Sequence, residues 1–216
     1  MAEVELGFNG MISGKLGDFV LYRVGGKTYL RKRPKRREKA PSEGQARQQS
    51  KLSGAMVMYR FVKQCKLKQV FAAWAKETGA RSGYNLFLSK NMNAFGQNDY
   101  VDYSLLVAAG GSLQLPNELS YCGLEGNRAA FTWTDNTSGD TARSDDRMQA
   151  AVITEDEPYR IAVPEETAGL RLNGKGSVAL PEGAWQTAHV YVFFSTADGS
   201  KHSPCVYFKI EKPQND

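Results

Sequence analysis

With 216 residues, 41% of them hydrophobic and 11% aromatic, the chain can bury the core of one large or two small domains, which excludes a mainly disordered protein. Its net charge of +5 divides into two opposite parts: 19 Lys and Arg against 7 Asp and Glu in residues 1–100, and 9 against 16 in residues 101–216. Such an asymmetry concerns partners and assembly rather than fold. The composition therefore favours a binding protein, and no catalytic signature accompanies it.

The N-terminus is acidic and has no long apolar run, and the longest apolar stretch, near 188–194, is far shorter than the roughly 20 residues of a membrane helix. We therefore expect a soluble, cytoplasmic protein with no secretory signal and no membrane partner. Cys65, Cys122 and Cys205 lie far apart without a Cys-x-x-Cys spacing. This pattern predicts buried free thiols rather than a zinc site or a disulfide framework.

A β-hairpin is predicted over residues 18–33, because two strand-like runs flank Gly25 and Gly26, which can both take positive φ. A two-residue turn fixes the register, so Tyr22 faces Tyr29 on one side of the ribbon and Leu21 faces Leu30 on the other. Both sides then carry apolar groups. Because an isolated two-stranded ribbon is marginal in water, we expect it to be covered by the rest of the chain or by another subunit.

The hairpin continues into a basic run, since residues 27–39 hold eight Lys and Arg and one acid, Glu38. The end of this run is predicted to be an extended, solvated linker. Three interpretations remain: a solvated charge run, contact with an acidic protein surface such as the acidic half of a neighbouring copy, or nucleic acid whose phosphates meet the cations while its bases stack on tyrosines. The candidate binding residues are Tyr22, Arg23, Lys27, Tyr29, Arg31, Lys32, Arg33, Lys35, Arg36, Arg37 and Lys39.

Two or three helices are predicted next. Ser42 and Gln45 have the spacing of a capping box, a break is expected near Cys65, and Gly79 and Ser82 resemble a helix stop followed by a new cap. Apolar residues recur at helical spacing in three stretches. The predicted buried stripes are Leu52, Ala55, Met56, Tyr59 and Val62, then Leu67, Val70, Phe71 and Trp74, then Tyr84, Leu88, Met92 and Phe95 in a helix ending near Gly96.

After residue 98 the apolar period becomes strand-like, with turn residues between the runs. This pattern predicts an antiparallel, immunoglobulin-like β-sandwich with Trp133 in its core and a type I′ turn at Asp198 and Gly199. The expected fold is thus α+β, with a basic hairpin arm (1–41), a helical segment (42–98) and a sandwich (99–216). The expected strands are 103–108, 112–115, 129–134, 148–154, 159–163, 178–180, 188–195 and 205–210.

The two histidines do not suggest a metal site. A turn at residues 198–199 places His189 opposite Phe208 and Ser195 opposite His202, so the imidazoles are separated by about 20 Å of strand. We interpret the Ser195 and His202 pair as cross-strand polar pairing, because no pocket, orienting acid or oxyanion donor is indicated beside it. We expect no catalytic residue and no cofactor.

Two loops superficially suggest ligands. The acidic segment 135–146 lacks the spacing and terminal Glu of an EF-hand, so we interpret it as a turn and expect no metal. Residues 10–17 resemble a phosphate loop but lack its Gly-Lys-Ser/Thr ending and the following helix, which argues against nucleotide binding.

The segment Gly14-Lys15-Leu16-Gly17-Asp18-Phe19-Val20-Leu21-Tyr22-Arg23 precedes Gly26-Lys27, Tyr29, Arg31 and Pro34, and then Gln45 and Gln49. This pattern resembles an uncharacterised protein family of Bacteroidota, and the later Gly110-Gly111-Ser112-Leu113 is similar to the middle of that family. The hairpin with its Gln-rich helix is also similar, more distantly, to phage virion and assembly proteins. The first resemblance implies an architecture and no catalytic residues, and the second implies a place in a phage-like or mobile-element assembly.

These observations lead to three functional hypotheses. The first is a non-enzymatic interaction or structural protein, a homo-oligomer or part of a protein assembly, whose basic arm docks on a partner or neighbouring subunit. The second is a nucleic-acid-binding protein that uses the same Arg, Lys and Tyr side chains. The third is a carbohydrate-binding or sugar-acting sandwich, which requires a cleft with an exposed Trp133 or Trp185 and paired carboxylates. No small-molecule substrate is identified.

Overall fold

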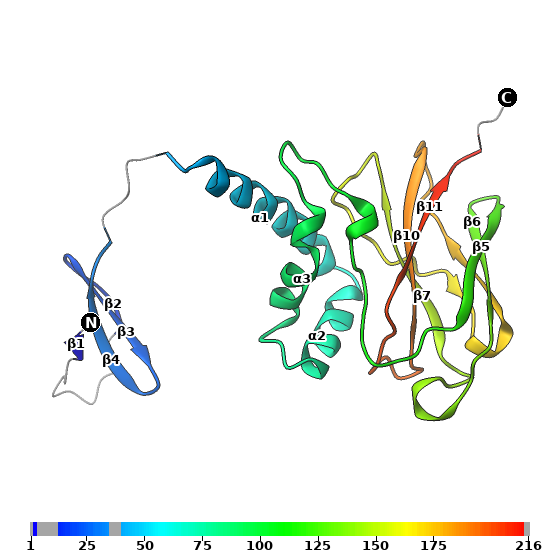
Figure 1. Cartoon of the computed structure of the whole chain (residues 1–216), viewed down its shortest axis with the longest axis horizontal. Coiled ribbons are helices and arrows are strands. Elements are labelled where there is room, and N and C mark those ends of the chain that lie inside the picture. The colour runs from blue at the N-terminus through cyan, green and yellow to red at the C-terminus, as the bar shows by residue number, and fades with distance from the viewer. Residues whose placement is uncertain (1, 4–12, 35–39, 214–216) are drawn as a thin grey trace. The chain divides into compact units, whose positions relative to one another are not determined.

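The computed structural model describes residues 2–3, 13–34 and 40–213, which belong to two compact units, Met1–Pro41 and Ser42–Asp216. The described chain is a mixed α+β protein with three α-helices and three antiparallel sheets (Figure 1). At this level the predicted α+β class is confirmed.

The first unit is a small sheet with the strand order β1-β4-β3-β2. The central hairpin has the predicted register, since Tyr22 pairs with Tyr29 and Leu21 with Leu30. Its turn residues Gly25 and Gly26 have φ values of 58° and 84°, and a type I′ turn requires positive φ at both positions. The strands are β1 (Ala2–Glu3), β2 (Gly14–Leu16), β3 (Phe19–Val24) and β4 (Lys27–Lys32).

The second unit begins with the helices α1 (Glu43–Val62), α2 (Leu67–Glu77) and α3 (Gly83–Asn91). Ser42 and Gln45 form the predicted capping box, in which each side chain bonds the other residue's backbone N–H. Ser82 caps α3, and Gly79 takes the left-handed conformation that follows α2. The predicted helix starts and the break between α1 and α2 are therefore confirmed.

The buried face of α1 differs from the predicted stripe. Leu52 and Met56 are exposed, whereas Met58 is fully buried between Ala55 and Val62. A Cβ at Gly54 would lie 3.0 Å from the Phe95 ring, so this glycine lets the helix approach closely on that side.

The end of α3 also differs from the prediction. The helix ends at Asn91 rather than near Gly96, and a 3₁₀ turn (Met92–Ala94) follows it. Its buried residues are Leu86, Phe87 and Asn91, while Tyr84, Leu88 and Met92 are only partly buried. The buried Asn91 amide bonds Val107, where the side-chain oxygen accepts from the backbone N–H at 2.7 Å and the side-chain nitrogen donates to the carbonyl at 3.1 Å.

Two further antiparallel sheets complete this unit, with the orders β11-β10-β7 and β5-β6-β9-β8. The strands at 129–134, 148–154, 178–180, 188–195 and 205–210 are confirmed within a few residues. The bounds are β5 (Asn117–Glu125), β6 (Arg128–Thr134), β7 (Arg147–Thr154), β8 (Thr167–Ala168), β9 (Lys175–Ala179), β10 (Thr187–Ser195) and β11 (Val206–Glu211).

Three predicted strands are wrong, and four observed strands, β1, β2, β5 and β8, were not predicted. Residues 103–105 form a 3₁₀ turn, 112–115 pair with no strand, and 159–163 contribute a single bridge. Leu113 and Ile161 are buried by packing rather than by ladder pairing, and Leu105 is 51% exposed. Strand β8 has only two residues. Strand β5 has register shifts and Glu118 at φ 56°, which interrupt the alternation on which sequence-based detection depends.

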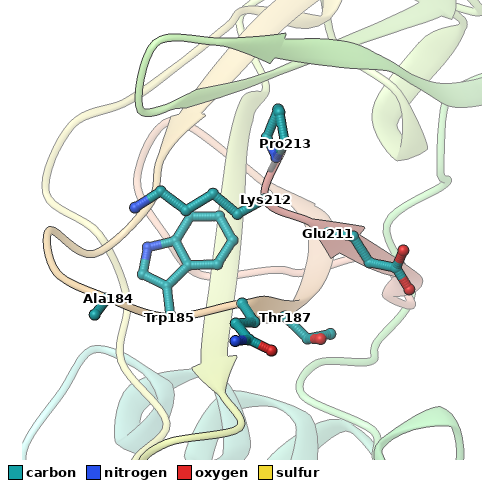
Figure 2. A pocket seen from close by; sticks show the side chains of 7 residues that line it. Ala184, Trp185, Thr187, Glu211, Lys212 and Pro213 are labelled. Atoms are coloured by element: carbon teal, nitrogen blue, oxygen red, sulfur yellow. The ribbon is translucent and has the colours of Figure 1, made fainter. Parts of the chain in front are cut away.

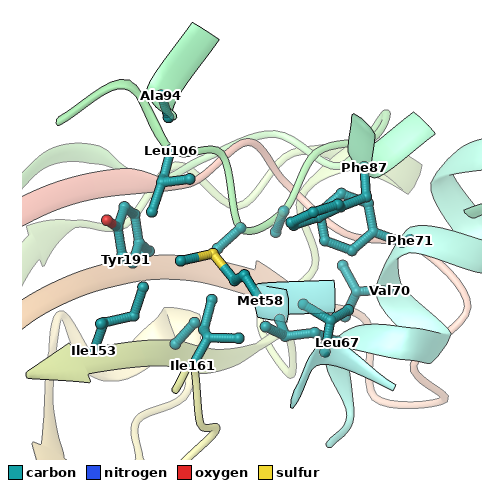
Figure 3. Close-up of a cluster of buried hydrophobic side chains, with 14 of the residues drawn as sticks. Met58, Leu67, Val70, Phe71, Phe87, Ala94, Leu106, Ile153, Ile161 and Tyr191 are labelled. Atoms are coloured by element: carbon teal, nitrogen blue, oxygen red, sulfur yellow. The ribbon is translucent and has the colours of Figure 1, made fainter. Parts of the chain in front are cut away.

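Strand β10 lies at the centre of the second unit, and all nine of its residues are buried. Val190, Val192 and Phe194 pack with the β5-β6-β9-β8 sheet, and the alternate residues Tyr191 and Phe193 pack against the helices. Figure 3 shows Tyr191 in this position. The helices and the strands after residue 98 thus share one hydrophobic cluster, shown in Figure 3. The predicted core residue Trp133 is buried and contacts Phe194 edge to face.

A buried charge pair holds the loops at one end of the two sheets. Arg171 and Asp146 have fully buried side chains, and Arg171 Nε donates to Asp146 Oδ2 at 3.0 Å. The same guanidinium donates to Asn136 Oδ1 and to the Gln114 carbonyl, both at 2.6 Å. The Arg171 guanidinium therefore connects its own segment to the three segments that contain Asp146, Asn136 and Gln114.

Candidate interaction surface

One face of the arm sheet gathers four of the eleven predicted binding residues. Cross-strand partners lie on the same face, so Tyr22, Tyr29 and Arg31 share a side of the hairpin. The two rings stack with centroids 5.7 Å apart, and the Arg31 guanidinium lies 5.6 Å from the Tyr22 centroid. Lys27 and Lys15 fall on this side through their pairing with Val24 and Val20. We call Lys15, Tyr22, Lys27, Tyr29 and Arg31 the basic face.

The opposite side of the sheet is largely apolar. Leu16, Phe19, Leu21 and Leu30 share it by register, and we call these four residues the apolar face. Leu21 is buried, whereas Leu16 and Phe19 are 64% and 43% exposed. An exposed group of this kind is typical of an interaction surface when it lies beside charged residues.

The other predicted site residues are not all on the basic face. Arg23 and Lys32 project on the apolar side, and Arg23 Nε donates to the Gly26 carbonyl at 3.1 Å. Arg33 follows β4, is exposed, and donates its backbone N–H to Asp18. The remaining predicted residues, Lys35, Arg36, Arg37 and Lys39, lie outside the described residues.

Sequence reasoning missed Lys15. It lies on strand β2, in the segment compared above with a phosphate loop, and the described end of that segment, residues 14–16, is an edge strand instead. Gly17 at φ 54° is the signal for the turn between β2 and β3. Residues 1–41 hold ten Lys and Arg against four Asp and Glu, so the arm is basic as a whole.

The C-terminal hairpin confirms one predicted pair and corrects another. Ser195 bridges His202 as predicted, but His189 pairs with Lys209 rather than Phe208. The register changes by one residue around Ser203 and Pro204, where Ser203 bonds both the N–H and the carbonyl of Phe194 and Pro204 has no N–H to donate.

The turn of this hairpin is not type I′. Of Asp198 and Gly199, only Gly199 has positive φ, and Thr196 N–H donates to the Lys201 carbonyl across a four-residue loop. The Asp198 carboxylate accepts from Thr196 and Ser200, which lowers its pKa to about 2. These local bonds stabilise the longer loop.

His189 belongs to a buried polar cluster. Its ring stacks on Tyr103 with centroids 3.9 Å apart, its Nδ1 lies 2.8 Å from the Tyr207 hydroxyl, and its Nε2 lies 3.4 Å from Glu155. Burial lowers the pKa of His189, against the opposing effect of Glu155. Across residues 2–3, 13–34 and 40–213, no three His, Cys, Asp or Glu side chains are arranged to hold a metal ion.

The acidic segment 135–146 is largely occupied by internal bonds. Asp135 accepts from the Thr137 hydroxyl and N–H, which lowers the Asp135 pKa. Asn136 bonds the Leu115 carbonyl and Arg171, and Asp146 bonds Arg171. The segment therefore has the contacts of a turn.

The three cysteines are unpaired, but the prediction that all are buried is wrong for Cys122, which is exposed. Cys122 lies on β5, an edge strand, and its sulfur lies 3.1 Å from the Thr132 hydroxyl. Cys65 and Cys205 are partly buried.

The cleft required by the carbohydrate hypothesis is not formed around either named tryptophan. Trp133 and Trp185 are 6% and 2% exposed. A cavity of about 710 Å³ borders Trp185, but Lys212 Nζ lies 5.1 Å from the centroid of that ring and covers it (Figure 2). The carboxylate in the lining of this cavity, Glu211, is bonded to Lys209.

None of the helices in the described part of the chain is both long and apolar enough to span a membrane.

Comparison with known proteins gives a family and little else. Among solved structures, the spore cortex lytic enzyme SleM of Clostridium perfringens matches at a TM-score of 0.28 and 17% identity, over 55% of this chain and 32% of SleM. The chain thus spans about a third of that enzyme, and this likeness is too weak to bear on fold or activity. No curated protein shows significant similarity. A family model matches residues 11–209, so the chain belongs to the family of unknown function DUF6266.

Proposed function

We propose that this protein is a non-enzymatic interaction protein whose basic arm docks on an acidic protein surface, with a neighbouring copy of the chain as the first partner to test. The observation that carries the proposal is the combination of exposed apolar side chains with many cations on a separate small unit. Leu16, Phe19 and Val24 are 64%, 43% and 59% exposed. Covering such side chains contributes about 25 cal/mol for each Å² of apolar surface removed from water.

Charge supports a second copy as the partner. Residues 101–216 carry a net charge of −7, opposite in sign to the arm. Electrostatic complementarity of this kind mainly raises association rates and orients the partners, while apolar burial supplies affinity. The arm also lacks His and Cys, two residue types on which nucleophilic and acid–base catalysis often depends.

We further propose that the two larger sheets form an immunoglobulin-like body that carries the arm. Two strand orders support this: β5-β6-β9-β8 corresponds to the A-B-E-D sheet of a constant-type domain and β7-β10-β11 to its C-F-G sheet. Trp133 departs from the pattern, since it lies on the second of these strands rather than the third.

Unpaired cysteines favour a cytoplasmic setting, and the likeness to phage virion proteins favours a role in a phage-like assembly.

Size-exclusion chromatography with light scattering tests the docking. The full chain is expected to associate at high concentration, more strongly at about 50 mM than at about 500 mM salt, because salt screens the charges. Val24→Thr and Phe19→Thr keep strand propensity and are expected to weaken association. Met56→Gln is the matched control, because Met56 is 43% exposed on α1, outside the acidic residues 101–216. A monomer at all concentrations, with residues 13–34 protected from hydrogen exchange, contradicts the proposal.

Nucleic acid is the second candidate, and the basic face is the observation that favours it. Stacked Tyr22 and Tyr29, with Arg31 over the Tyr22 ring, offer rings for bases and a cation for a phosphate. If about six to eight phosphates are neutralised, the logarithm of affinity falls against the logarithm of salt with a slope of about −5 to −7. Joint replacement by Ala of Arg33, Lys35, Arg36 and Arg37 should reduce that slope. Absence of salt-dependent binding favours protein docking.

A further inference from the structure

Three polar side chains lie in a row on the helix-facing side of the β7-β10 sheet, within the second unit. Arg147 pairs with Ser195 across β7 and β10, and His202 bridges Ser195 from the other side. Directly opposed residues share a face, so the three side chains leave the sheet on one side, and all three line one cavity. The helix-packed Phe193 is on the same face of β10, two residues away.

A cavity of about 210 Å³ lies over this row. One wall is the first turn of α2, with Lys66 and Gln69, and another is the loop 196–199. A second cavity, of about 280 Å³, shares Lys66, Arg147 and Gln149 with the first. The two cations therefore border both spaces.

His202 supplies an unsatisfied buried group in this lining. The residue is 4% exposed, its Nδ1 lies 2.7 Å from Ser195 Oγ, and its Nε2 is buried without a hydrogen-bond partner. A buried polar atom without a partner is costly in a native protein and calls for an explanation such as a bound molecule. With no acid at Nε2, the pair lacks the third member of a catalytic triad.

The charge of the lining favours an anion. Lys66 and Arg147 are exposed cations at its edge, and the N-terminus of α2 adds a partial positive charge. Asp198 also borders the cavity, but its carboxylate already accepts from Thr196 and Ser200. One ionised carboxylate, whose Oδ1 is already hydrogen-bonded, thus faces two cations and a helix N-terminus.

We infer that this cavity binds a small molecule through a phosphate group, held by Lys66 and Arg147 over the Ser195 and His202 pair. Its volume is below the roughly 300–1,000 Å³ of pockets for drug-sized ligands, so the ligand is small. The site is independent of the arm and of the docking proposed above.

Imidazole ¹⁵N NMR of the full chain tests the site with inorganic phosphate as the probe, because the chain has two histidines and His189 serves as an internal reference. Phosphate is expected to shift the His202 resonances saturably and leave those of His189 unchanged, at ionic strength held constant with sodium chloride. Lys66→Gln and Arg147→Gln are each expected to weaken binding about tenfold or more, since each removes a charge-assisted hydrogen bond. Lys175→Gln, an exposed change elsewhere, should have no effect.

Two results overturn the inference. The first is an absent or non-saturating His202 shift, or an equal shift of both histidines. The second is unchanged phosphate affinity in Lys66→Gln and Arg147→Gln. An equal response to acetate overturns the assignment to phosphate, because acetate carries a planar carboxylate instead.

Discussion

Replacing Arg171 by Met tests the buried charge pair. The guanidinium makes three side-chain hydrogen bonds, to Asp146, Asn136 and the Gln114 carbonyl, and both charged side chains are fully buried. In Arg171→Met, Asn136 Oδ1 and the Gln114 carbonyl lose this donor, and the buried Asp146 carboxylate loses its cation while its Oδ2 still accepts from the Arg143 backbone N–H at 2.9 Å. Asp146 is affected most, because its other oxygen, Oδ1, already has no partner.

Removing one partner of a buried ion pair typically costs about 3–5 kcal/mol of unfolding free energy. In a unit of this size, about 1 kcal/mol shifts Tm by about 2–4 °C, so Arg171→Met is expected to lower Tm by about 6–20 °C. Urea and thermal unfolding followed by circular dichroism measure both quantities.

Arg160→Met is the matched control for this prediction. Arg160 pairs with Glu157 at 2.9 Å, but both side chains are more than half exposed, so its loss should cost less than about 1 kcal/mol. Equal small losses in Arg171→Met and Arg160→Met would refute the reasoning. The double variant Asp146→Asn with Arg171→Met should lose less than the sum of its single changes, because the two residues are coupled.

Two further predictions concern pH and packing. Burial lowers the folded-state pKa of His189 and His202, so the unfolded chain binds protons before the folded chain does as the pH falls. The contribution of the neutral histidines to the free energy of unfolding is therefore complete above about pH 7. It falls as the pH drops through about 6.5, by up to about 1.4 kcal/mol per pH unit for each histidine. Urea midpoints at several pH values check this, and His202→Gln should flatten the profile; an unchanged slope contradicts it. In Gly110→Ala the new Cβ would lie 2.5 Å from the Trp74 ring, so we expect a loss of about 1–3 kcal/mol in urea unfolding. Gly44→Ala meets nothing within 4 Å and should not destabilise, and equal effects of the two substitutions would show that the contact is unimportant.

Two local signals in the sequence predicted the structure well, whereas a third, Asp198 with Gly199, predicted the wrong turn type. Gly25 and Gly26 fix the hairpin register through the turn itself, and Ser42 with Gln45 fixes the start of α1 through two hydrogen bonds. Neither depends on distant parts of the chain. Sequence alone therefore determined which residues of the hairpin share a face, but not that Lys15 and Leu16 of β2 join these faces.

Features that depend on distant contacts were not predictable. The buried side of α1 turns toward Phe95 at Gly54, and the register of β10 with β11 changes at Pro204, where a ladder hydrogen bond is lost. The cavity beside His202 requires the first turn of α2 to lie against the end of β10, more than a hundred residues later in the chain. Periodicity carries no information on such a contact.

The central position of β10 has a consequence for inheritance. One face of β10 packs against the helices and the other against the second sheet, so the stability of both layers depends on this strand. A protein without the helices would expose Tyr191 and Phe193 to water. We therefore expect the helices and the sheets to be inherited together as one unit. A family model that runs unbroken from residue 11 to residue 209 is consistent with such joint descent.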